Sequence, residues 1–224
     1  MELTLLCTCV CSTTDNKHYG RCYSPWSLSC TAGGSSGGSA SATAGGLCAF
    51  AIGSDTLGSC RIPASYSGCV GLKPTHGRVP TSDAMPLSWS LDSVGPLTRT
   101  VEDAALVLRT LCGIHADDPC SISSDPEDLA LWPCSPNDVE SSRAAVRGLR
   151  VGLLLECMQD DGSEEELAVR GAVLDALRVL VERGGVQQVD VEESFADLRR
   201  HTYAVCHSDA SAIHRERYEA RADQ

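Results

Sequence analysis

The sequence predicts an α/β protein, and its clearest signal is a strand–helix–strand unit in the second half of the chain. Residues 149–155 are apolar enough for a buried strand. Ser163 and Glu166 have the spacing of a capping box, and an apolar stripe with helical periodicity continues to about Arg183. A second strand is predicted for residues 186–191. Two strands joined through a helix are expected to be parallel, which is the basis of the α/β class.

The composition excludes several classes of partner. The net charge of −12 argues against nucleic acid or an anionic membrane surface, because both require clustered Lys and Arg. The 13 cysteines are scattered through apolar segments, where free thiols pack as small hydrophobes, so we expect a reducing compartment. The N-terminal run lacks the basic residues of a signal peptide, and no apolar run has membrane-spanning length. A cytoplasmic protein is therefore expected.

The N-terminal part of the chain combines one predicted strand with loops and small-residue segments. Residues 3–11 are expected to form a short buried strand, and residues 12–32 carry turn signals typical of a loop. The segment from Gly38 to about Ala51 is built almost entirely of small residues. It suits a short helix that lies close to neighbouring backbone.

The elements further along the chain are predicted from caps and periodicity. Thr100 is the expected N-cap of a helix over residues 101–112, and Gly113 follows its end. Residues 114–148 are rich in Asp, Ser and Pro and lack periodicity, which indicates an irregular surface connection. Residues 194–221 are predicted to be helical.

Two glycine-rich loops that carry serines lie close together in the sequence, at residues 33–39 and 53–61. Glycine allows a ligand or another backbone segment to approach closely, so these loops indicate a site where backbone N–H groups and serine hydroxyls converge. The first loop has the glycine spacing of a P-loop. However, Ser39 and Ala40 stand where a P-loop requires Lys and Ser or Thr, which excludes nucleotide binding by this route.

The first loop also matches the nucleophile elbow Gly-x-Ser-x-Gly in two registers, with either Ser35 or Ser36 as the nucleophile. An elbow should follow a buried strand, yet residues 26–31 are only half apolar. Asp92 and His115 are candidates for the remaining members of a triad, although nothing in the sequence marks them. An α/β-hydrolase-type esterase that uses Ser36 is kept as an alternative.

The ordered series of motifs resembles the amidase-signature family of serine hydrolases, in its general amidase type. Residues 33–39 resemble the family's first glycine-serine loop, and residues 53–64 resemble its nucleophile loop. The similarity continues through residues 68–79 and 90–105 and is looser toward the C-terminus. It implies an α/β fold with a mixed β-sheet core flanked by helices, incomplete in this chain.

The resemblance also implies one partial domain over residues 1–224. Its expected parts are a signature core with both serine loops at 31–113, an irregular connection at 114–148, and a strand–helix–strand–helix part at 149–224.

The family's chemistry is a Ser–Ser–Lys triad that hydrolyses a small or linear amide to a carboxylate and an amine or ammonia. By position, Ser59 is the implied nucleophile and Ser35 the bridging serine, which is usually held by a cis peptide bond from Gly34. Backbone N–H groups of the nucleophile loop would form the oxyanion hole, and three further side chains would brace the two loops by hydrogen bonds. The implied oxyanion-hole residues are Thr56, Leu57, Gly58 and Ser59, and the bracing residues are Ser36, Asp55 and Arg61.

Three positions depart from common family patterns. Leu57 stands where glycine is commoner, so its side chain is expected to narrow the substrate pocket and change selectivity. Ile62 stands where the A subunit of glutamyl-tRNA amidotransferases usually has Gln, which favours a general amidase. Cys60 is expected to be a small packing residue. The six histidines match no family role and are assigned to surface or structural positions.

The family's general base is a lysine well upstream of the first serine loop, and neither Lys17 nor Lys73 stands at a matching position. We therefore expect a partial sequence that lacks the lysine region and the C-terminal part of the domain and is inactive by itself. Three interpretations are open. The chain is a part of a working amidase, a truncated product that folds poorly and exposes strand edges, or a non-catalytic binding module that retains the pocket.

The expected partner is a small-molecule amide substrate. Nucleic acid and membrane are not expected as partners, and neither a cofactor nor a metal ion is expected. A homodimer is left open.

Overall fold

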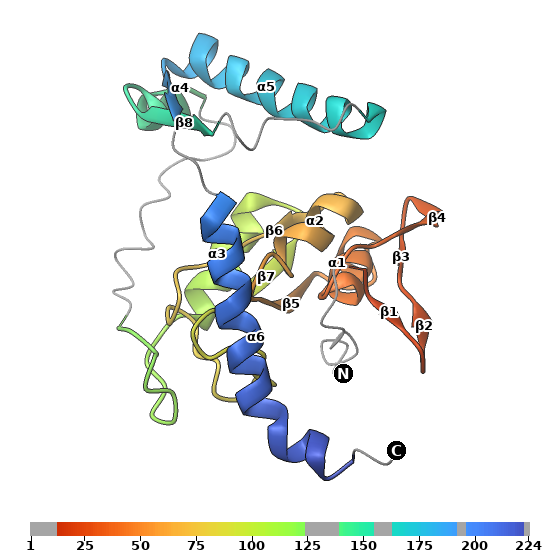
Figure 1. Cartoon of the computed structure of the whole chain (residues 1–224). Coiled ribbons are helices and arrows are strands. Elements are labelled where there is room, and N and C mark those ends of the chain that lie inside the picture. Colours follow the sequence, from red (N-terminus) through yellow and green to blue (C-terminus); the bar gives the residue numbers. More distant parts are fainter. Residues whose placement is uncertain (1–12, 124–138, 155–162, 192–195, 222–224) are drawn as a thin grey trace. The chain divides into compact units, whose positions relative to one another are not determined.

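The computed structural model describes residues 13–123, 139–154, 163–191 and 196–221 (Figure 1). It divides into two compact units, one made of Met1–Leu129 with Tyr203–Gln224 and the other of Ala130–Thr202. The strand predicted for residues 3–11 lies outside the described residues.

Two small antiparallel hairpins begin the described part of the first unit. Strand β1 (Asp15–Asn16) pairs with β2 (Gly20–Arg21), and β3 (Tyr23–Ser24) pairs with β4 (Ser27–Thr31). The loop predicted for residues 12–32 is therefore wrong in these segments. The strands are short and polar and do not alternate in hydrophobicity, so the sequence carries no signal for them.

A three-stranded antiparallel sheet with the order β5-β7-β6 forms the centre of the first unit. Its strands are β5 (Phe50–Asp55), β6 (Val70–Gly71) and β7 (Ser93–Thr98). The central strand β7 places Gly95 opposite Gly53 and Ser93 opposite Asp55. The register thus brings the C-terminal end of β5, where the second glycine loop begins, next to the start of β7.

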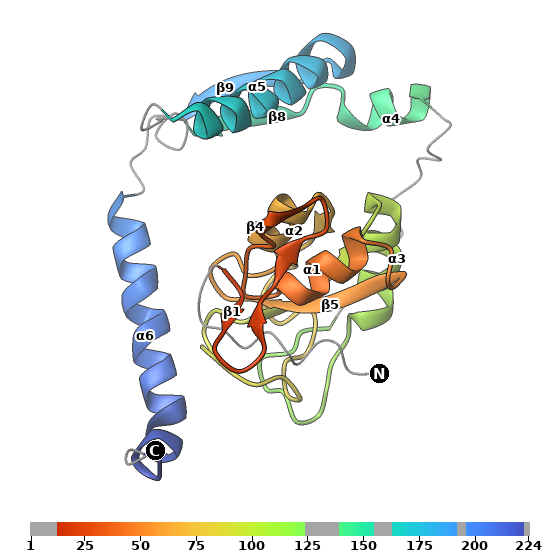
Figure 2. The same cartoon turned by 90° about the vertical axis from the view of Figure 1, so that its right-hand side faces the viewer.

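Helices α1 (Gly37–Ala44) and α2 (Arg61–Ser67) contact each other, and each contacts this sheet (Figure 2). The buried core between them is made of small side chains around one leucine: Ala40, Cys60, Ala64 and Leu97. Small side chains let helix and strand backbones approach closely, which keeps the two glycine loops together.

Helix α1 is shorter than the helix predicted to reach Ala51. It ends at Ala44 because Gly45 and Gly46 follow, and Gly46 adopts a left-handed conformation with a φ of +73°. The chain then turns into β5. The segment of small residues therefore includes helix α1, the turn after it and the start of strand β5.

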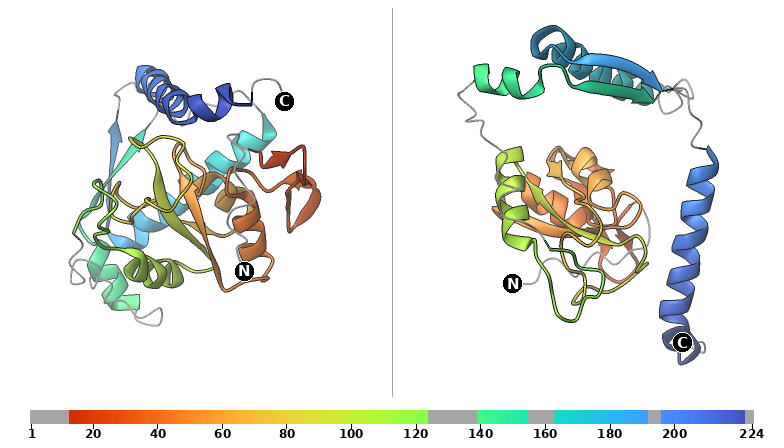
Figure 3. Two further views of the ribbon diagram at one scale, coloured as in Figure 1. Left: turned by 90° about the horizontal axis from the view of Figure 1, so that it is seen from below. Right: turned by 90° about the vertical axis from the view of Figure 1, so that its left-hand side faces the viewer.

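The cap predicted for the helix after β7 is confirmed. Thr100 Oγ1 accepts a hydrogen bond of 3.1 Å from the backbone N–H of Asp103 and begins α3 (Val101–Leu111). Helix α3 contacts β7 and β6 (Figure 3). The long helix predicted near the C-terminus is also present, as α6 (Ala196–Glu219).

The second unit contains the predicted strand–helix–strand arrangement. Strands β8 (Arg150–Leu154) and β9 (Gln187–Val191) are parallel, and α5 (Glu164–Gly184) connects them. Ser163 accepts a hydrogen bond from the N–H of Glu166, which confirms the helix start. Helix α4 (Val139–Val146) was missed, since it lies in the segment predicted to be irregular and its polar residues lack a clear apolar stripe. Antiparallel and parallel strands together with helices confirm the α/β class.

Within the described ranges, no helix combines the length and the apolar character needed to cross a membrane.

At Gly53, strand β5 lies close to residues of both loops, and its substitution tests this packing. A Cβ atom on Gly53 would lie 2.7 Å from Ser36 Oγ, 2.8 Å from Leu97 Cδ1 and 2.9 Å from Cys60 Sγ. We expect Gly53→Ala to lower the free energy of unfolding by about 1–3 kcal/mol, the usual range for overpacking. Urea titration followed by circular dichroism measures the change.

Gly171→Ala is the matched control, because a Cβ atom there meets nothing within 4 Å on helix α5. It should be neutral or stabilise the helix by up to about 1 kcal/mol. Equal losses of stability in both variants would contradict the close packing around Gly53.

Candidate active site

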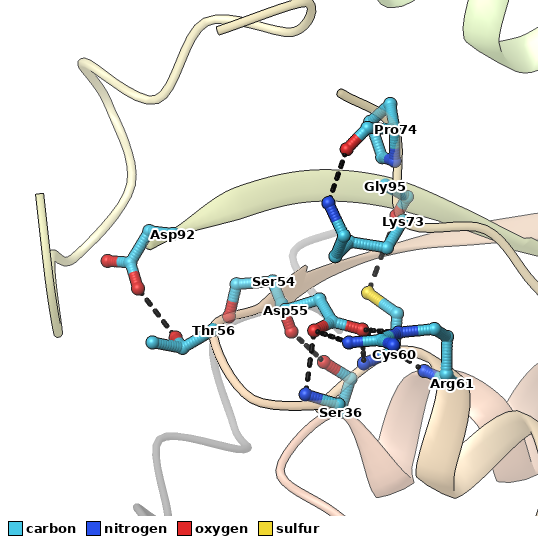
Figure 4. A network of polar contacts seen from close by, with 11 residues as sticks. Ser36, Ser54, Asp55, Thr56, Cys60, Arg61, Lys73, Pro74, Asp92 and Gly95 are labelled. Carbon is cyan, nitrogen blue, oxygen red and sulfur yellow. Dashed lines mark hydrogen bonds and ion pairs between the residues drawn. The ribbon is translucent and has the colours of Figure 1, made fainter. Parts of the chain in front are cut away.

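The second glycine loop connects the end of β5 to the start of α2 and is organised around Asp55. The carboxylate of Asp55 is fully buried. Its Oδ1 accepts hydrogen bonds from Gly58 N and Arg61 Nη2, at 2.7 and 2.9 Å (Figure 4). Its Oδ2 accepts from Arg61 Nε at 2.9 Å and from Cys60 N at 3.2 Å. Both carboxylate oxygens therefore hold the loop in a closed turn.

The ion pair with Arg61 keeps Asp55 charged despite its burial. Burial alone would raise the pKa of the Asp55 carboxyl, but the hydrogen bonds and charge of Arg61, together with the N–H groups of Gly58 and Cys60, lower that pKa below its ordinary value. The Arg61 guanidinium keeps about half of its side chain exposed, so the pair bridges the loop interior and the surface.

The first glycine loop contains the cis peptide bond that the family resemblance implies, between Gly34 and Ser35. Thr14, which the sequence did not mark, holds this loop. Its buried Oγ1 lies 2.7 Å from the carbonyl oxygen of Gly33 and 3.1 Å from that of Ser35, and it accepts a hydrogen bond of 3.1 Å from Gly37 N. A single hydroxyl thus ties the two sides of the cis peptide to the start of α1.

Ser36 joins the two loops. Its backbone N–H donates to the carbonyl oxygen of Ser59 at 3.1 Å, and its Oγ donates to the carbonyl oxygen of Ser54 at 3.2 Å. Ser36 is 5% exposed. Ser36 therefore links the two loops, whereas the contacts between Asp55 and Arg61 lie within the second loop, and the bracing role of all three residues stays a prediction.

Ser35 and Ser59 line the same pocket and are each partly exposed. No hydrogen bond joins either Oγ to another described residue. The remaining lining residues come from both loops, from helix α2, from the segment before Asp92 and from helix α6: Gly34, Thr56, Leu57, Ile62, Leu87, Tyr203, Cys206, His207 and Ala210. Leu57 therefore lies in the pocket wall, where its side chain was expected.

The N–H of Gly58 is directed at Asp55 Oδ1, so Gly58 supports the loop and is not a free donor toward the pocket. Thr56 and Leu57 line the pocket. Thr56 is fixed there by its own Oγ1, which donates to Asp92 Oδ1 at 2.5 Å. The other oxygen of Asp92 accepts from the N–H groups of Leu87 and Ser88 at 2.7 and 3.0 Å.

Helix α6 contributes four pocket residues that the sequence did not predict. His207 was assigned to the surface or to a structural position, and it is an exposed residue that also lines the pocket. The helix is attached to the same region through Asp209, whose Oδ2 accepts from Ser88 Oγ at 2.6 Å and from Ser90 N at 3.3 Å. These contacts span more than a hundred residues of sequence, and no local pattern reveals them.

Lys17 and Lys73 lie apart from this pocket. Lys17 is exposed in the turn between β1 and β2, and the ammonium group of Lys73 donates to the carbonyl oxygen of Pro74 at 2.7 Å (Figure 4). Neither residue lines the pocket of Ser35 and Ser59. In the part of the chain that the structure describes, no three His, Cys, Asp or Glu side chains gather as metal ligands.

The family model described as Amidase matches residues 6–223. The chain belongs to the amidase family. The A subunit of glutamyl-tRNA(Gln) amidotransferase from Prochlorococcus marinus (strain MIT 9211) is 43% identical over 203 residues, which are 90% of this chain and 39% of that protein.

Solved structures place the amidase chain in the amidase-signature fold. The A subunit of glutamyl-tRNA(Gln) amidotransferase from Thermotoga maritima matches with a TM-score of 0.75 and 31% identity over 91% of this chain and 42% of that one. A bacterial aryl acylamidase of the amidase signature family matches with a TM-score of 0.73 and 30% identity, over 94% of this chain and 41% of that one. The chain thus spans about two fifths of the length of these relatives.

Two alternative nucleophiles in the amidase loops are disfavoured by their surroundings. The thiol of Cys60 is fully buried, and burial raises its pKa to about 12, so it packs in the core as expected. Ser36, the elbow candidate, is buried and donates its hydroxyl to a backbone carbonyl. His115, the candidate base of the elbow, contacts Ser82 and does not line the pocket.

Removing Arg61 tests whether its charge holds the amidase loop. We expect Arg61→Ala to lower the free energy of unfolding at pH 7 by about 2 kcal/mol, less than for a fully buried pair because Arg61 is half exposed. Asp55 has a lowered folded-state pKa, so its contribution is present above an unfolded pKa of about 4 and is lost as the pH falls through the folded value. In Arg61→Ala this loss should begin at a higher pH. Urea unfolding between pH 3 and pH 7 measures both effects.

Arg21→Ala is the matched control, since Arg21 forms a bond of 2.8 Å with Asp15 and both side chains are about half exposed. We expect no measurable loss of stability and no displacement of the acid transition, because solvent screens an exposed ion pair. A loss in Arg21→Ala as large as that in Arg61→Ala would count against a special role for the Asp55–Arg61 pair.

Proposed function

We propose that the chain is the serine-bearing part of an amidase in which Ser59 attacks the carbonyl carbon of an amide. One observation carries the proposal: Ser59 and Ser35 are partly exposed and line one pocket together with Thr56 and Leu57. Family membership supports chemistry at amide C–N bonds.

In the proposed reaction, Ser59 Oγ forms a bond to the carbonyl carbon while its proton passes to Ser35 Oγ, and Ser35 gives its own proton to a base. Backbone N–H groups of Thr56, Leu57 and Ser59 stabilise the oxyanion, and one such donor typically contributes about 3–4 kcal/mol in the transition state. The C–N bond then breaks, and the leaving nitrogen takes the proton. Water attacks the acyl ester in the reverse sequence and releases the carboxylate.

The base in this mechanism is the lysine that the family resemblance implies, and neither Lys17 nor Lys73 is suited to the role. Without the base, we expect the 224-residue chain to retain only the residual rate enhancement of the oxyanion loop and of substrate binding, roughly 10³–10⁴-fold over water. Because this rate is expected to be low, the nucleophile is better tested by covalent labelling than by measuring turnover.

A fluorophosphonate probe followed by peptide mass spectrometry tests the nucleophile. We expect a covalent adduct on Ser59 after prolonged incubation, its complete loss in Ser59→Ala, and no change in Ser29→Ala, which alters an exposed serine of β4. Labelling that persists in Ser59→Ala would contradict the assignment. Loss in Ser36→Ala with retention in Ser59→Ala would instead support the esterase elbow.

A second candidate function is favoured by the 43% identity to the A subunit of glutamyl-tRNA(Gln) amidotransferase. In that case the chain is part of an amidotransferase subunit, and its partners are protein subunits and not a second copy of itself. Ile62 and the net charge of −12 favour the general amidase instead. Co-expression with the other subunits of such an enzyme, followed by native mass spectrometry, distinguishes the two. A stable complex supports the amidotransferase, and its absence supports the general amidase.

A further inference from the structure

Helix α6 presents two neighbouring aromatic rings to the pocket that holds Ser35 and Ser59. Tyr203 and His207 are four residues apart, so they lie on the same face of the helix. Their ring centroids are 6.1 Å apart and their planes differ by 24°. The two rings are therefore stacked beside each other, and this pair of pocket-lining rings is called the aromatic wall.

The rest of the pocket lining is largely apolar, and Ser35, Thr56 and Ser59 add hydroxyl groups to it. Leu57, Ile62 and Leu87 line the pocket, and within the described residues no Asp, Glu, Lys or Arg side chain does. A carboxylate group of a substrate would therefore lose its hydration here without gaining a partner of opposite charge, which is strongly unfavourable, and it would also face the negative charges of Asp92 and Asp209, which, in addition to burial, raise the pKa of the pocket residue Cys206. An uncharged group that is planar and apolar meets no such penalty.

The helix that carries the aromatic wall is anchored to the segment that contacts the second glycine loop. Asp209, two residues after His207, accepts hydrogen bonds from Ser88 Oγ and Ser90 N. The N–H of Ser88 in turn donates to Asp92, which also accepts from Thr56 Oγ1. A wall held in place before the substrate arrives loses little conformational freedom on binding, so its shape selects among substrates.

We propose that Tyr203 and His207 are specificity-determining residues that select amides with an uncharged aromatic group next to the scissile bond. The inference rests on the proposed amidase function and narrows its substrate class. Aromatic rings prefer offset-stacked or edge-to-face contacts with one another, and the two-ring wall offers such a surface to the substrate's ring. Free glutamine, which carries a carboxylate group, is selected against by the same pocket.

Binding of small amides to the complete 224-residue chain tests the proposal without requiring turnover. The probes are benzamide, butyramide and L-glutamine, and the readout is the titration of the ¹³C-labelled methyl signals of Ile62. We expect benzamide to bind about tenfold more tightly than butyramide and L-glutamine to show no binding at the same concentrations. Tyr203→Ala and His207→Ala should each reduce the benzamide preference by at least about threefold, whereas His207→Phe retains it because it keeps a ring.

His214→Ala and Tyr218→Ala are the matched controls, since both residues lie on α6 outside the pocket lining. They should leave the preference unchanged, and circular dichroism confirms that all variants keep their helix content. Equal binding of benzamide and butyramide, tighter binding of L-glutamine, or a preference that is insensitive to both wall residues overturns the proposal.

The fluorophosphonate adduct on Ser59 tests the proposed function, independently of the binding experiment that tests the specificity. A selective pocket without an adduct means that the specificity assignment holds and the nucleophile assignment fails. An adduct without selectivity means the reverse.

Discussion

The buried carboxylate of Asp55 is the constraint on which the geometry of the site depends. A charged group with no exposed surface is tolerated only where its oxygens are fully paired, and here Arg61 and the backbone N–H groups of Gly58 and Cys60 meet that requirement. The pairing bends the chain between β5 and α2 into a closed turn. Ser59 lies inside this turn, so its position depends on the hydrogen bonds and the ion pair that the Asp55 carboxylate makes.

Close packing of small residues then brings the first glycine loop, with Ser35 and Ser36, next to the loop that carries Ser59. Gly53 leaves room for Ser36, and the N–H and Oγ of Ser36 donate to the carbonyl oxygens of Ser59 and Ser54. Since Ser36 is committed to these bonds, Ser35 is the serine of its loop that lines the pocket. Adjacent serines in one loop thus have different tasks, because one faces the backbone of the other loop and its neighbour faces the ligand space.

Sequence patterns predicted those features that depend on interactions between residues close together in the chain. The capping hydrogen bonds at Thr100 and Ser163 and the parallel pair of β8 and β9 follow from spacing and periodicity alone. The ordered motifs marked the two serine loops. The polar hairpins and helix α4 have no periodicity to detect, and Thr14 acts through contacts with residues 19 to 23 positions away. The α6 wall is further still from the loops in sequence, so only the folded chain brings it to the site.

The route from α6 to the nucleophile loop is a short chain of hydrogen bonds, and this has a consequence for how specificity and catalysis are related. Asp209 holds Ser88, the N–H of Ser88 is held by Asp92, and Asp92 fixes Thr56 in the proposed oxyanion loop. The same carboxylate that positions a backbone donor therefore also positions the segment on which the aromatic wall rests. A substrate group that displaces helix α6 is expected to disturb this chain of hydrogen bonds, and with it the N–H donors proposed for the oxyanion. Poorly fitting amides are thus expected to lose transition-state stabilisation as well as binding, because the two functions share one network of bonds.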